Sequence, residues 1–462
     1  MNTDNAELKI GMKTFMIAVV ILLVLIVLSG ALTQVIPTGE FERNIDGTVI
    51  AGTYNQTNAD KLPVWRWIAA PVMVLGSSDG IMIIAIVMFL LIIGGSIHIL
   101  NQSGILKSII ASIVERYSEK KYFLLGIIIF VFMSVGSFIG IFEEVIPLIP
   151  IMVMLAINLG WDTMTGLGMT LLSTGIGFSA AVTNPFTVGI AQGIAGLPPF
   201  SGSFYRLFIF FVIYLFTFLF ISQYAKKIDT NIVSDVKVFK ENMTNPRAIK
   251  FFLVVMSIML LTVLSSPFVP FIQAIVLPLI GLFFLVASFG SNLMIGIKIK
   301  DILKNWLNGA KAMSPGIVLI LLATSVKYII VSGGIMDTIL FNASLIIENS
   351  SRLVALIGTY GMTMLLNFFI GSGSAKAFLM MPILSPLMDL AGVSRQLAVL
   401  AFQFGDGFSN ILYPTNAVLL IGLGISDVSY MKWFKWIIGF QIFLMLLSVG
   451  FLALGLAMGY GV

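Results

Sequence analysis

The sequence contains no cysteine and a single histidine, His98, among 462 residues. Without cysteine there are no disulfides, no thiolate metal ligands and no cysteine nucleophile, and one histidine cannot build a histidine-rich metal site. Charged residues are also scarce, at 10% of the chain, whereas about a quarter of the residues in a water-soluble domain are charged. The scarcity of charge, together with 58% hydrophobic residues, excludes a soluble globular protein. The absence of cysteine and the single histidine disfavour hydrolytic or metal-dependent chemistry.

The few charges are scattered along the chain. The balance of 26 Lys and Arg against 21 Asp and Glu is +5, with no basic block, which argues against a nucleic acid partner. No phosphate-cradling loop of the GxxxxGK[ST] type occurs, so ATP-driven transport by this chain alone is not expected. The first apolar run, 15–36, is too long for the core of a signal peptide, and we expect it to be a retained helix.

Apolar runs long enough to cross a bilayer recur along the whole chain. They occur near 14–36, 79–100, 163–183, 204–223, 250–268, 271–290, 314–331, 396–412 and 434–459. Two longer apolar stretches, 122–160 and 353–391, are interrupted by glycine and polar residues. We interpret each as a re-entrant helical hairpin whose polar tip stops inside the membrane. The sequence therefore predicts an all-α polytopic membrane protein.

The positions of Lys and Arg predict the topology. The stretch 224–250 carries six of them and the loop 37–66 only three, so the first is expected in the cytoplasm and the second outside. Two amphipathic stretches, 101–121 and 331–352, precede the hairpins and carry four and one of these residues, a contrast that predicts opposite membrane faces. We expect a cytoplasmic N-terminus and an external C-terminus in the cytoplasmic membrane.

The two halves repeat one order of elements: a spanning helix, an amphipathic helix, a hairpin and an interrupted helix. Equivalent elements of opposite orientation form an inverted repeat, which characterises secondary transporters. The expected division is an N-terminal helix with an external loop (1–78), repeat 1 (79–223, with hairpin 122–160 and broken helix 163–200), a cytoplasmic linker (224–250), two connecting transmembrane helices (251–313), and repeat 2 (314–462, with hairpin 353–391 and broken helix 396–424).

Each broken helix is interrupted at a proline, Pro185 or Pro414. Proline lacks an N–H, so a carbonyl one turn earlier loses its partner, and the neighbouring Asn and Thr side chains can offer oxygen ligands to a small cation or a polar substrate. A proline kink satisfied by threonine or water is the alternative. Because the two halves have their breaks in equivalent places, each beside a hairpin tip, a binding site is favoured over two simple proline kinks.

The first hairpin tip places Glu143 and Glu144 between apolar arms. Ionised groups at this depth are costly unless paired or hydrated, so they commonly mark a substrate or ion path. The alternative is a structural carboxylate that stabilises the tip. At the second tip, Lys376 could neutralise a substrate carboxylate or pair with Glu143, Glu144 or Asp406. Asp406 lies between two glycines in the middle of an apolar helix, where a functional role is favoured.

These arguments yield two sets of candidate residues. The predicted substrate-binding residues are Ser137, Glu143, Glu144, Asn184, Thr187, Ser372, Gly373, Ser374, Lys376, Asp406, Thr415 and Asn416. The predicted cation-binding residues are Ser134, Gly136, Thr183, Asn184, Ser409 and Asn410. Sodium ions and protons are the candidate coupling ions, and no other metal or cofactor is expected.

Three long motifs, GIFEEVIPLIPIMVMLAINLGWD, TNPFTVGIAQGIAGLPPFSG and SRQLAVLAFQFGDGFSNILYPTNAVLL, resemble the YfcC-type branch of the C4-dicarboxylate anaerobic carrier-like family, within the ion transporter superfamily. This resemblance implies an elevator-type homodimer, in which a scaffold domain holds a moving transport domain with both hairpins. It also implies that the hairpin tips and broken helices form the sites. Members of the family are dicarboxylate carriers or, in a related branch, arginine/ornithine exchangers.

We therefore expect a secondary active transporter or exchanger of a small charged organic solute, working by alternating access. An amino acid is the expected solute, and a basic, arginine/ornithine-like one is the leading candidate. Three acids around a single lysine can complement ammonium and carboxylate groups together. The alternative is a C4-dicarboxylate carrier coupled to sodium or protons. A passive channel is disfavoured because no ring of pore-lining charges repeats. An enzyme is not expected, since only Ser or Thr with Asp, Glu or Lys could form a nucleophile and base.

Overall fold

The computed structural model describes residues 12–45, 47–57, 59–230, 245–265, 269, 271–272, 275–348 and 350–461. Within these residues, eight helices are long and apolar enough to cross a membrane. They are Phe15–Val35, Gly80–Gln102, Ile105–Ile139, Ser203–Ile228, Pro246–Ser265, Val276–Met294, Ile299–Ser332 and Tyr430–Ala457. The expectation of an all-α, multi-pass membrane protein is confirmed. Lys237 and Lys240, on which the topology prediction partly depends, lie outside the described residues.

The N-terminal part contains a spanning helix followed by a strap of extended chain. Helix α1 (Met12–Val35) leads into β1 (Gly39–Glu40), which pairs antiparallel with β2 (Asn55–Gln56), and then into α2 (Val64–Met73). The short helix α2 lies mostly beyond the predicted external loop 37–66 and was not predicted, because its ten residues are too few to form a spanning run.

The first hairpin region is interrupted where the sequence predicts it. The elements are α3 (Gly80–Gln102), α4 (Ile105–Tyr117), α5 (Lys121–Ser134), η3 (Val135–Ile139), η4 (Glu143–Leu148) and α6 (Ile149–Asn158). Gly140 ends η3 with a φ of +79°, a conformation that glycine adopts without steric cost. The chain then turns so that the tip residues Glu143 and Glu144 begin η4.

The following segment is a helix in pieces. It comprises α7 (Thr163–Leu167), η5 (Gly168–Leu172), α8 (Ser173–Ser179), η6 (Pro185–Gly189) and α9 (Ile190–Ile194). Asp162 caps α7, with its Oδ1 accepting a hydrogen bond from the backbone N–H of Thr165 at 2.9 Å. The helix stops before Pro185, as predicted, and Asn184 caps the helical turn that restarts there.

Among its described residues, the central part includes a helix that the hydropathy pattern does not predict. It contains α10 (Ser203–Ile228), α12 (Pro246–Ser265), α14 (Val276–Met294), α15 (Ile299–Ala312) and α16 (Ser314–Ser332). The additional helix is α15, whose Lys-rich exposed face keeps it below the hydropathy of a spanning run. Its inner face packs on α3, where a Cβ on Gly309 would lie 2.7 Å from the carbonyl oxygen of Gly94.

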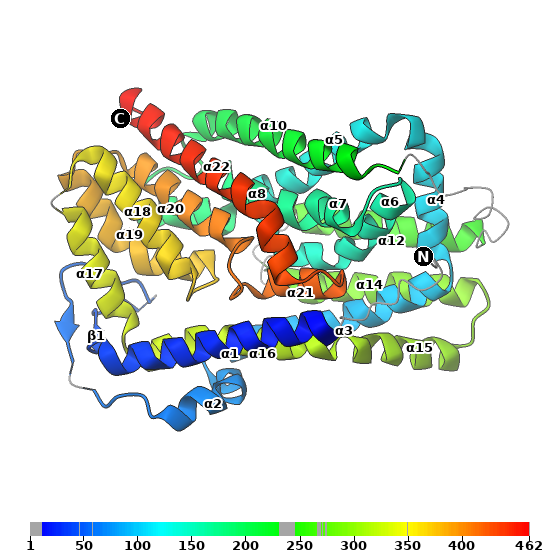
Figure 1. Cartoon of the computed structure of the whole chain (residues 1–462), viewed down its shortest axis with the longest axis horizontal. Coiled ribbons are helices and arrows are strands. Elements are labelled where there is room, and N and C mark those ends of the chain that lie inside the picture. Colours follow the sequence, from blue (N-terminus) through cyan, green and yellow to red (C-terminus); the bar gives the residue numbers. More distant parts are fainter. Residues whose placement is uncertain are drawn as a thin grey trace.

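The C-terminal part covers the predicted second hairpin and second broken helix. The elements are α17 (Met336–Glu348), α18 (Arg352–Asn367), α19 (Gly373–Leu390), α20 (Arg395–Asn410), α21 (Ala417–Ile425) and α22 (Tyr430–Ala457). In Figure 1, α4 and α17 lie at opposite ends of the molecule and run across the direction of α1 and α16.

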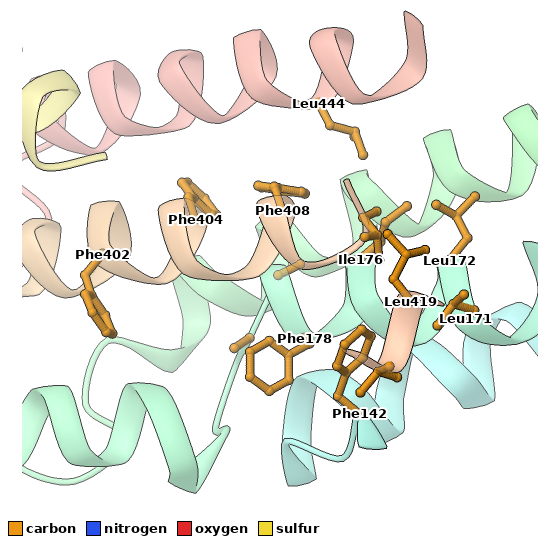
Figure 2. Packing of buried hydrophobic residues seen from close by; sticks show 14 of the residues in the cluster. Phe142, Leu171, Leu172, Ile176, Phe178, Phe402, Phe404, Phe408, Leu419 and Leu444 are labelled. Atoms are coloured by element: carbon orange, nitrogen blue, oxygen red, sulfur yellow. The ribbon is translucent and has the colours of Figure 1, made fainter. Parts of the chain in front are cut away.

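Helix α8 lies at the centre of the core, where glycines let three helices approach closely. A Cβ on Gly177 would lie 2.1 Å from the carbonyl oxygen of Met133 in α5, and a Cβ on Gly407 of α20 would lie 2.2 Å from Cα of Ser179. Around these crossings, Phe404 and Phe408 of α20 point toward Leu444 of α22, while Phe142 and Phe178 pack against each other on the opposite side of α20, with ring centroids 6.0 Å apart (Figure 2). The close packing fixes both breaks and both hairpin tips relative to one another.

Candidate transport site

A buried ion pair joins the second hairpin to the second broken helix. The Lys376 Nζ in the first turn of α19 lies 2.5 Å from Oδ1 of Asp406 in α20, and both side chains are 0% exposed. Removing two charges from water is expensive, so neither would remain buried and charged without its partner. Of the partners that the sequence analysis left open for Lys376, the structure pairs it with Asp406.

Asn367, at the end of α18, organises the residues around this pair. Its Oδ1 accepts a hydrogen bond from Lys376 Nζ. Its Nδ2 donates to the carbonyl oxygen of Asp406 at 3.0 Å, to Ser409 Oγ at 2.7 Å and to Asn410 Oδ1 at 3.0 Å. One side chain thus connects the tip of the second hairpin with the end of α20.

Lys376 is fully engaged within the protein. Besides Asn367 and Asp406, its Nζ donates to the carbonyl oxygen of Ile370 at 2.7 Å. An ammonium has three N–H donors, and three oxygens already surround this one. In this arrangement Lys376 has no donor left for a substrate carboxylate. Apart from Lys376, no described residue donates a hydrogen bond to either carboxylate oxygen of Asp406, so Lys376 alone balances the charge of Asp406.

The first break lies directly against the second hairpin tip. A Cβ on Gly373 would lie 2.5 Å from Cγ2 of Thr187 and 2.6 Å from Oδ2 of Asp406. Thr187 Oγ1 and Asn184 Nδ2 are buried and have no hydrogen-bond partner among the described residues. Because buried polar atoms are normally satisfied, these two atoms are the best candidates for contact with a solute.

The first hairpin tip is anchored to the same break. Ser137 Oγ donates to the carbonyl oxygen of Ala180 at 2.7 Å and accepts from the N–H of Val182 at 3.1 Å. Thr183 Oγ1 donates to the carbonyl oxygen of Phe138 at 3.1 Å. These contacts satisfy backbone groups that the interrupted helix leaves open. Ser137 and Thr183 therefore have structural partners in this arrangement.

Glu143 and Glu144 lie on the turn after Gly140 and are partly buried. Glu144 Oε2 accepts a hydrogen bond from the N–H of Phe142 at 3.2 Å. Neither carboxylate has an ion-pair partner among the described residues. Glu143 also lies close enough to Asp406 for the two carboxylates to interact electrostatically. The region around the buried ion pair therefore holds two carboxyl groups that no described cation neutralises.

The last helix of each half supplies donors to the carbonyls that the breaks expose. From α22, Trp433 Nε1 donates to the carbonyl oxygen of Ile411 at 2.9 Å, and Tyr430 donates to that of Leu412 at 2.7 Å. From α10, the buried Arg206 Nε donates to the carbonyl oxygen of Val182 at 3.0 Å. Such donors let interrupted helices persist within an apolar environment.

A cavity of about 500 Å³ reaches the second tip from the side of the β1–β2 strap. Its wall includes Ile370, whose carbonyl contacts Lys376, and Glu40 and Arg43 of the strap. Arg43 is held in a double contact with Asp337 of α17, at 2.7 and 2.8 Å. The cavity therefore lies between the strap and the residues of the second tip.

The remaining candidate residues have local roles. Ser372 caps α19 and lies within 3.2 Å of Ser374 Oγ. Asn416 caps α21 and donates to Asn410 Oδ1 at 3.1 Å. Ser134 Oγ is buried without a hydrogen-bond partner among the described residues. A Cβ on Gly136 would lie 2.4 Å from the carbonyl oxygen of Thr174, and Thr415 is partly buried in the second break.

Two residues that the candidate sets omit belong to this region. Asn367 is the centre of the network, and Gln403 of α20 donates through Nε2 to the carbonyl oxygen of Phe178 at 2.6 Å, while its Oε1 is buried without a partner among the described residues. Both residues place a polar amide inside an apolar run, and this feature of the sequence could have identified them as candidates.

Comparison with known proteins gives a consistent result along the whole chain. The DcuC family, described as C4-dicarboxylate anaerobic carrier, matches residues 15–458. A protein of Escherichia coli strain K12, YfcC, provisionally named a basic amino acid antiporter, is 30% identical over 379 residues, covering 76% of this chain and 73% of that protein. An uncharacterised protein of Haemophilus influenzae is 25% identical over 370 residues, covering 76% and 71%.

Two solved transporter structures align with this chain over most of their length, with TM-scores below 0.5. The YdaH transporter of Alcanivorax borkumensis has a TM-score of 0.44 and 16% identity, covering 97% of this chain and 98% of that one. MtrF of Neisseria gonorrhoeae, described within a class of antimetabolite efflux pumps, has a TM-score of 0.45 and 15% identity, covering 94% of each chain.

Proposed function

Because the chain belongs to the C4-dicarboxylate anaerobic carrier family of membrane transporters, we propose that it is a secondary active exchanger of basic amino acids in the cell membrane. The proposal combines three elements: a cationic substrate, a site between the two hairpin tips and the two breaks, and alternating access through movement of the hairpins. Each element depends on a different observation.

The charges around the site are the reason for proposing a cationic substrate. Lys376 and Asp406 neutralise each other at 2.5 Å. Glu143 and Glu144 have no ion-pair partner among the described residues. Unpaired carboxylates at such depth are stabilised by a cation, and a guanidinium or ammonium group of a substrate would supply it. A dianionic substrate would instead add to the negative charge.

The other end of an amino acid also finds partners nearby. Asn184 Nδ2 and Thr187 Oγ1, both buried and unsatisfied among the described residues, can donate hydrogen bonds to an α-carboxylate. They belong to the first break, which faces the second tip through Gly373. A substrate held between them and the acidic first tip would contact both hairpin regions at once.

The arrangement of elements favours an inverted repeat and an elevator-type movement. Both halves present a spanning helix, an amphipathic helix, a hairpin, a broken helix and a final helix in this order. The amphipathic helices α4 and α17 lie at opposite ends of the molecule (Figure 1), as elements of opposite orientation would. On this proposal the N-terminus is cytoplasmic, the C-terminus external, and a homodimeric scaffold supports the moving hairpins.

A C4-dicarboxylate carrier is the second candidate, because the family is described by that activity and amide and hydroxyl donors line the first break. Proteoliposomes loaded with unlabelled solute distinguish the two. Internal arginine, lysine or ornithine should accelerate the uptake of labelled arginine, whereas internal succinate or fumarate should not. Acceleration by the dicarboxylates alone would overturn the proposed substrate. Currents far above carrier turnover would instead indicate a channel.

The acidic tip provides a variant test of the same proposal. Glu143→Gln and Glu144→Gln should each raise the substrate concentration needed for half-maximal exchange, since each removes one charge that would attract the substrate. Glu42→Gln is the matched control, because Glu42 is an exposed residue of the strap. If both tip variants exchange arginine as the control does, the tip does not recognise the cationic group.

A further inference from the structure

We infer that the Lys376 ammonium occupies the position of a coupling cation, so that the second hairpin carries its own tethered cation and transport does not depend on sodium. The inference deepens the proposed function and is tested by two experiments. An exchange measurement, the transport arm, rests on the proposed function, and a thermal-unfolding measurement is the binding arm. Its binding arm depends only on the geometry around Lys376. The two arms can therefore fail separately.

The ligands of Lys376 are those of a site for a hard cation. Its Nζ contacts the side-chain carbonyl of Asn367, the backbone carbonyl of Ile370 and the carboxylate of Asp406. Carboxylate, backbone carbonyl and amide carbonyl oxygens are the protein ligands that hard cations such as Ca²⁺ select. Here they come from the end of α18, the hairpin tip and α20, so the three elements converge on one positive charge.

The carboxylate at this position depends on a cation. Apart from Lys376, no described residue donates a hydrogen bond to either oxygen of Asp406, and the side chain is 0% exposed. A buried carboxylate with neither hydrogen bonds nor a counter-charge is strongly destabilising. A positive charge at this point therefore holds the tip of the second hairpin against α20 and the first break.

A tethered ammonium and a free ion would have different consequences. A free sodium ion would bind and leave with each transport cycle and couple its gradient to the substrate. The Lys376 side chain is attached to α19, three residues after Gly373 at the tip, so its charge moves with the hairpin and is never released. The wild-type protein should then be indifferent to sodium, while a variant without the ammonium should acquire a sodium site.

The binding arm uses thermal unfolding of purified protein in sodium chloride or in choline chloride at equal ionic strength. Lys376→Ala should be less stable than wild type in choline, and its melting temperature should rise with sodium, by about 3 °C once sodium is 100-fold above its Kd. Wild type should show no such difference. The double variant K376A/D406N lacks both charges and should be insensitive to sodium.

Each other outcome of the binding arm overturns the inference. Equal melting temperatures for Lys376→Ala in sodium and choline would show that sodium does not replace the ammonium. If Lys376→Ala cannot be obtained folded even in sodium while the double variant can, the position does not accept sodium. If neither variant folds, the lysine is needed for packing rather than as a cation.

The transport arm measures exchange in proteoliposomes for whichever solute the wild-type protein exchanges. Wild-type rates in sodium and choline should agree within about twofold, and Lys376→Ala should regain exchange only with sodium. Sodium-dependent exchange by the wild-type protein would overturn the inference even if arginine is the substrate. If arginine is not exchanged at all but the binding arm gives the expected shifts, only the proposed substrate fails. Lys300→Ala is the control, since Lys300 is exposed on α15.

Discussion

Gly373 is expected to be the residue that lets the second hairpin tip close onto the first break, and Gly373→Ala tests this. The added Cβ would lie 2.5 Å from Cγ2 of Thr187 and 2.6 Å from Oδ2 of Asp406, whereas ordinary contact begins at 3.4 Å. The tip must therefore retreat by about 0.9 Å, because Asp406 is held by Lys376 and cannot give way without lengthening the ion pair.

Overpacking of this kind costs about 1 to 3 kcal/mol, which lowers the population of the closed arrangement by about 5-fold to 150-fold. The initial rate of exchange in proteoliposomes should fall by a factor in this range, with protein incorporation matched between samples. Alanine itself suits the first position of a helix, so the loss would come from the contacts and not from the backbone.

Gly371→Ala is the matched control, because a Cβ on Gly371, two residues earlier in the same tip, meets no atom within 4 Å. It should retain the wild-type rate. The reasoning is refuted if Gly373→Ala exchanges solute within about twofold of wild type, or if Gly371→Ala is impaired as severely.

Three further predictions concern how the fold is held together. Trp433→Phe should lower the melting temperature through a loss of about 1 to 3 kcal/mol, because it leaves the Ile411 carbonyl in the second break without its donor; an unchanged melting temperature would contradict this. Arg206→Met should lower the stability of the protein by at least about 2 kcal/mol, because the buried guanidinium loses its hydrogen bonds to the Val182 carbonyl, to Tyr460 and to the Ser201 carbonyl. Arg116→Met, on the exposed face of α4, is the control and should leave the stability unchanged. Arg43→Ala should release the strap from α17 and speed proteolysis within 47–57 from the external side of reconstituted vesicles. It should also lower stability by about 1 to 3 kcal/mol, because Asp337, whose side chain is only 6% exposed, loses its counter-charge. Cleavage only from the other side would reverse the proposed topology.

Hydropathy and proline position determined the succession of elements. Spanning helices were predicted because a run of about 20 apolar residues can satisfy its backbone only as a helix in a membrane. The two interruptions, after Gly140 and before Pro185, were predicted because these residue types stop a helix for local steric reasons. What the local rules missed were α2 and α15, since a short helix and a lysine-rich amphipathic one produce no spanning apolar run.

The sequence by itself also determined that Lys376, Asp406, Glu143 and Glu144 were unusual, because a charge inside an apolar run is costly wherever it falls. Only the tertiary structure decided which of them neutralise one another. Lys376 and Asp406 are 30 positions apart and meet because glycines bring α20 close to its neighbours, and Asn367 was recognised as the centre of their network only once α18 was in place. Pairing of buried charges depends on distances between helices, and those distances are set by packing across the whole core and not by any local stretch of sequence.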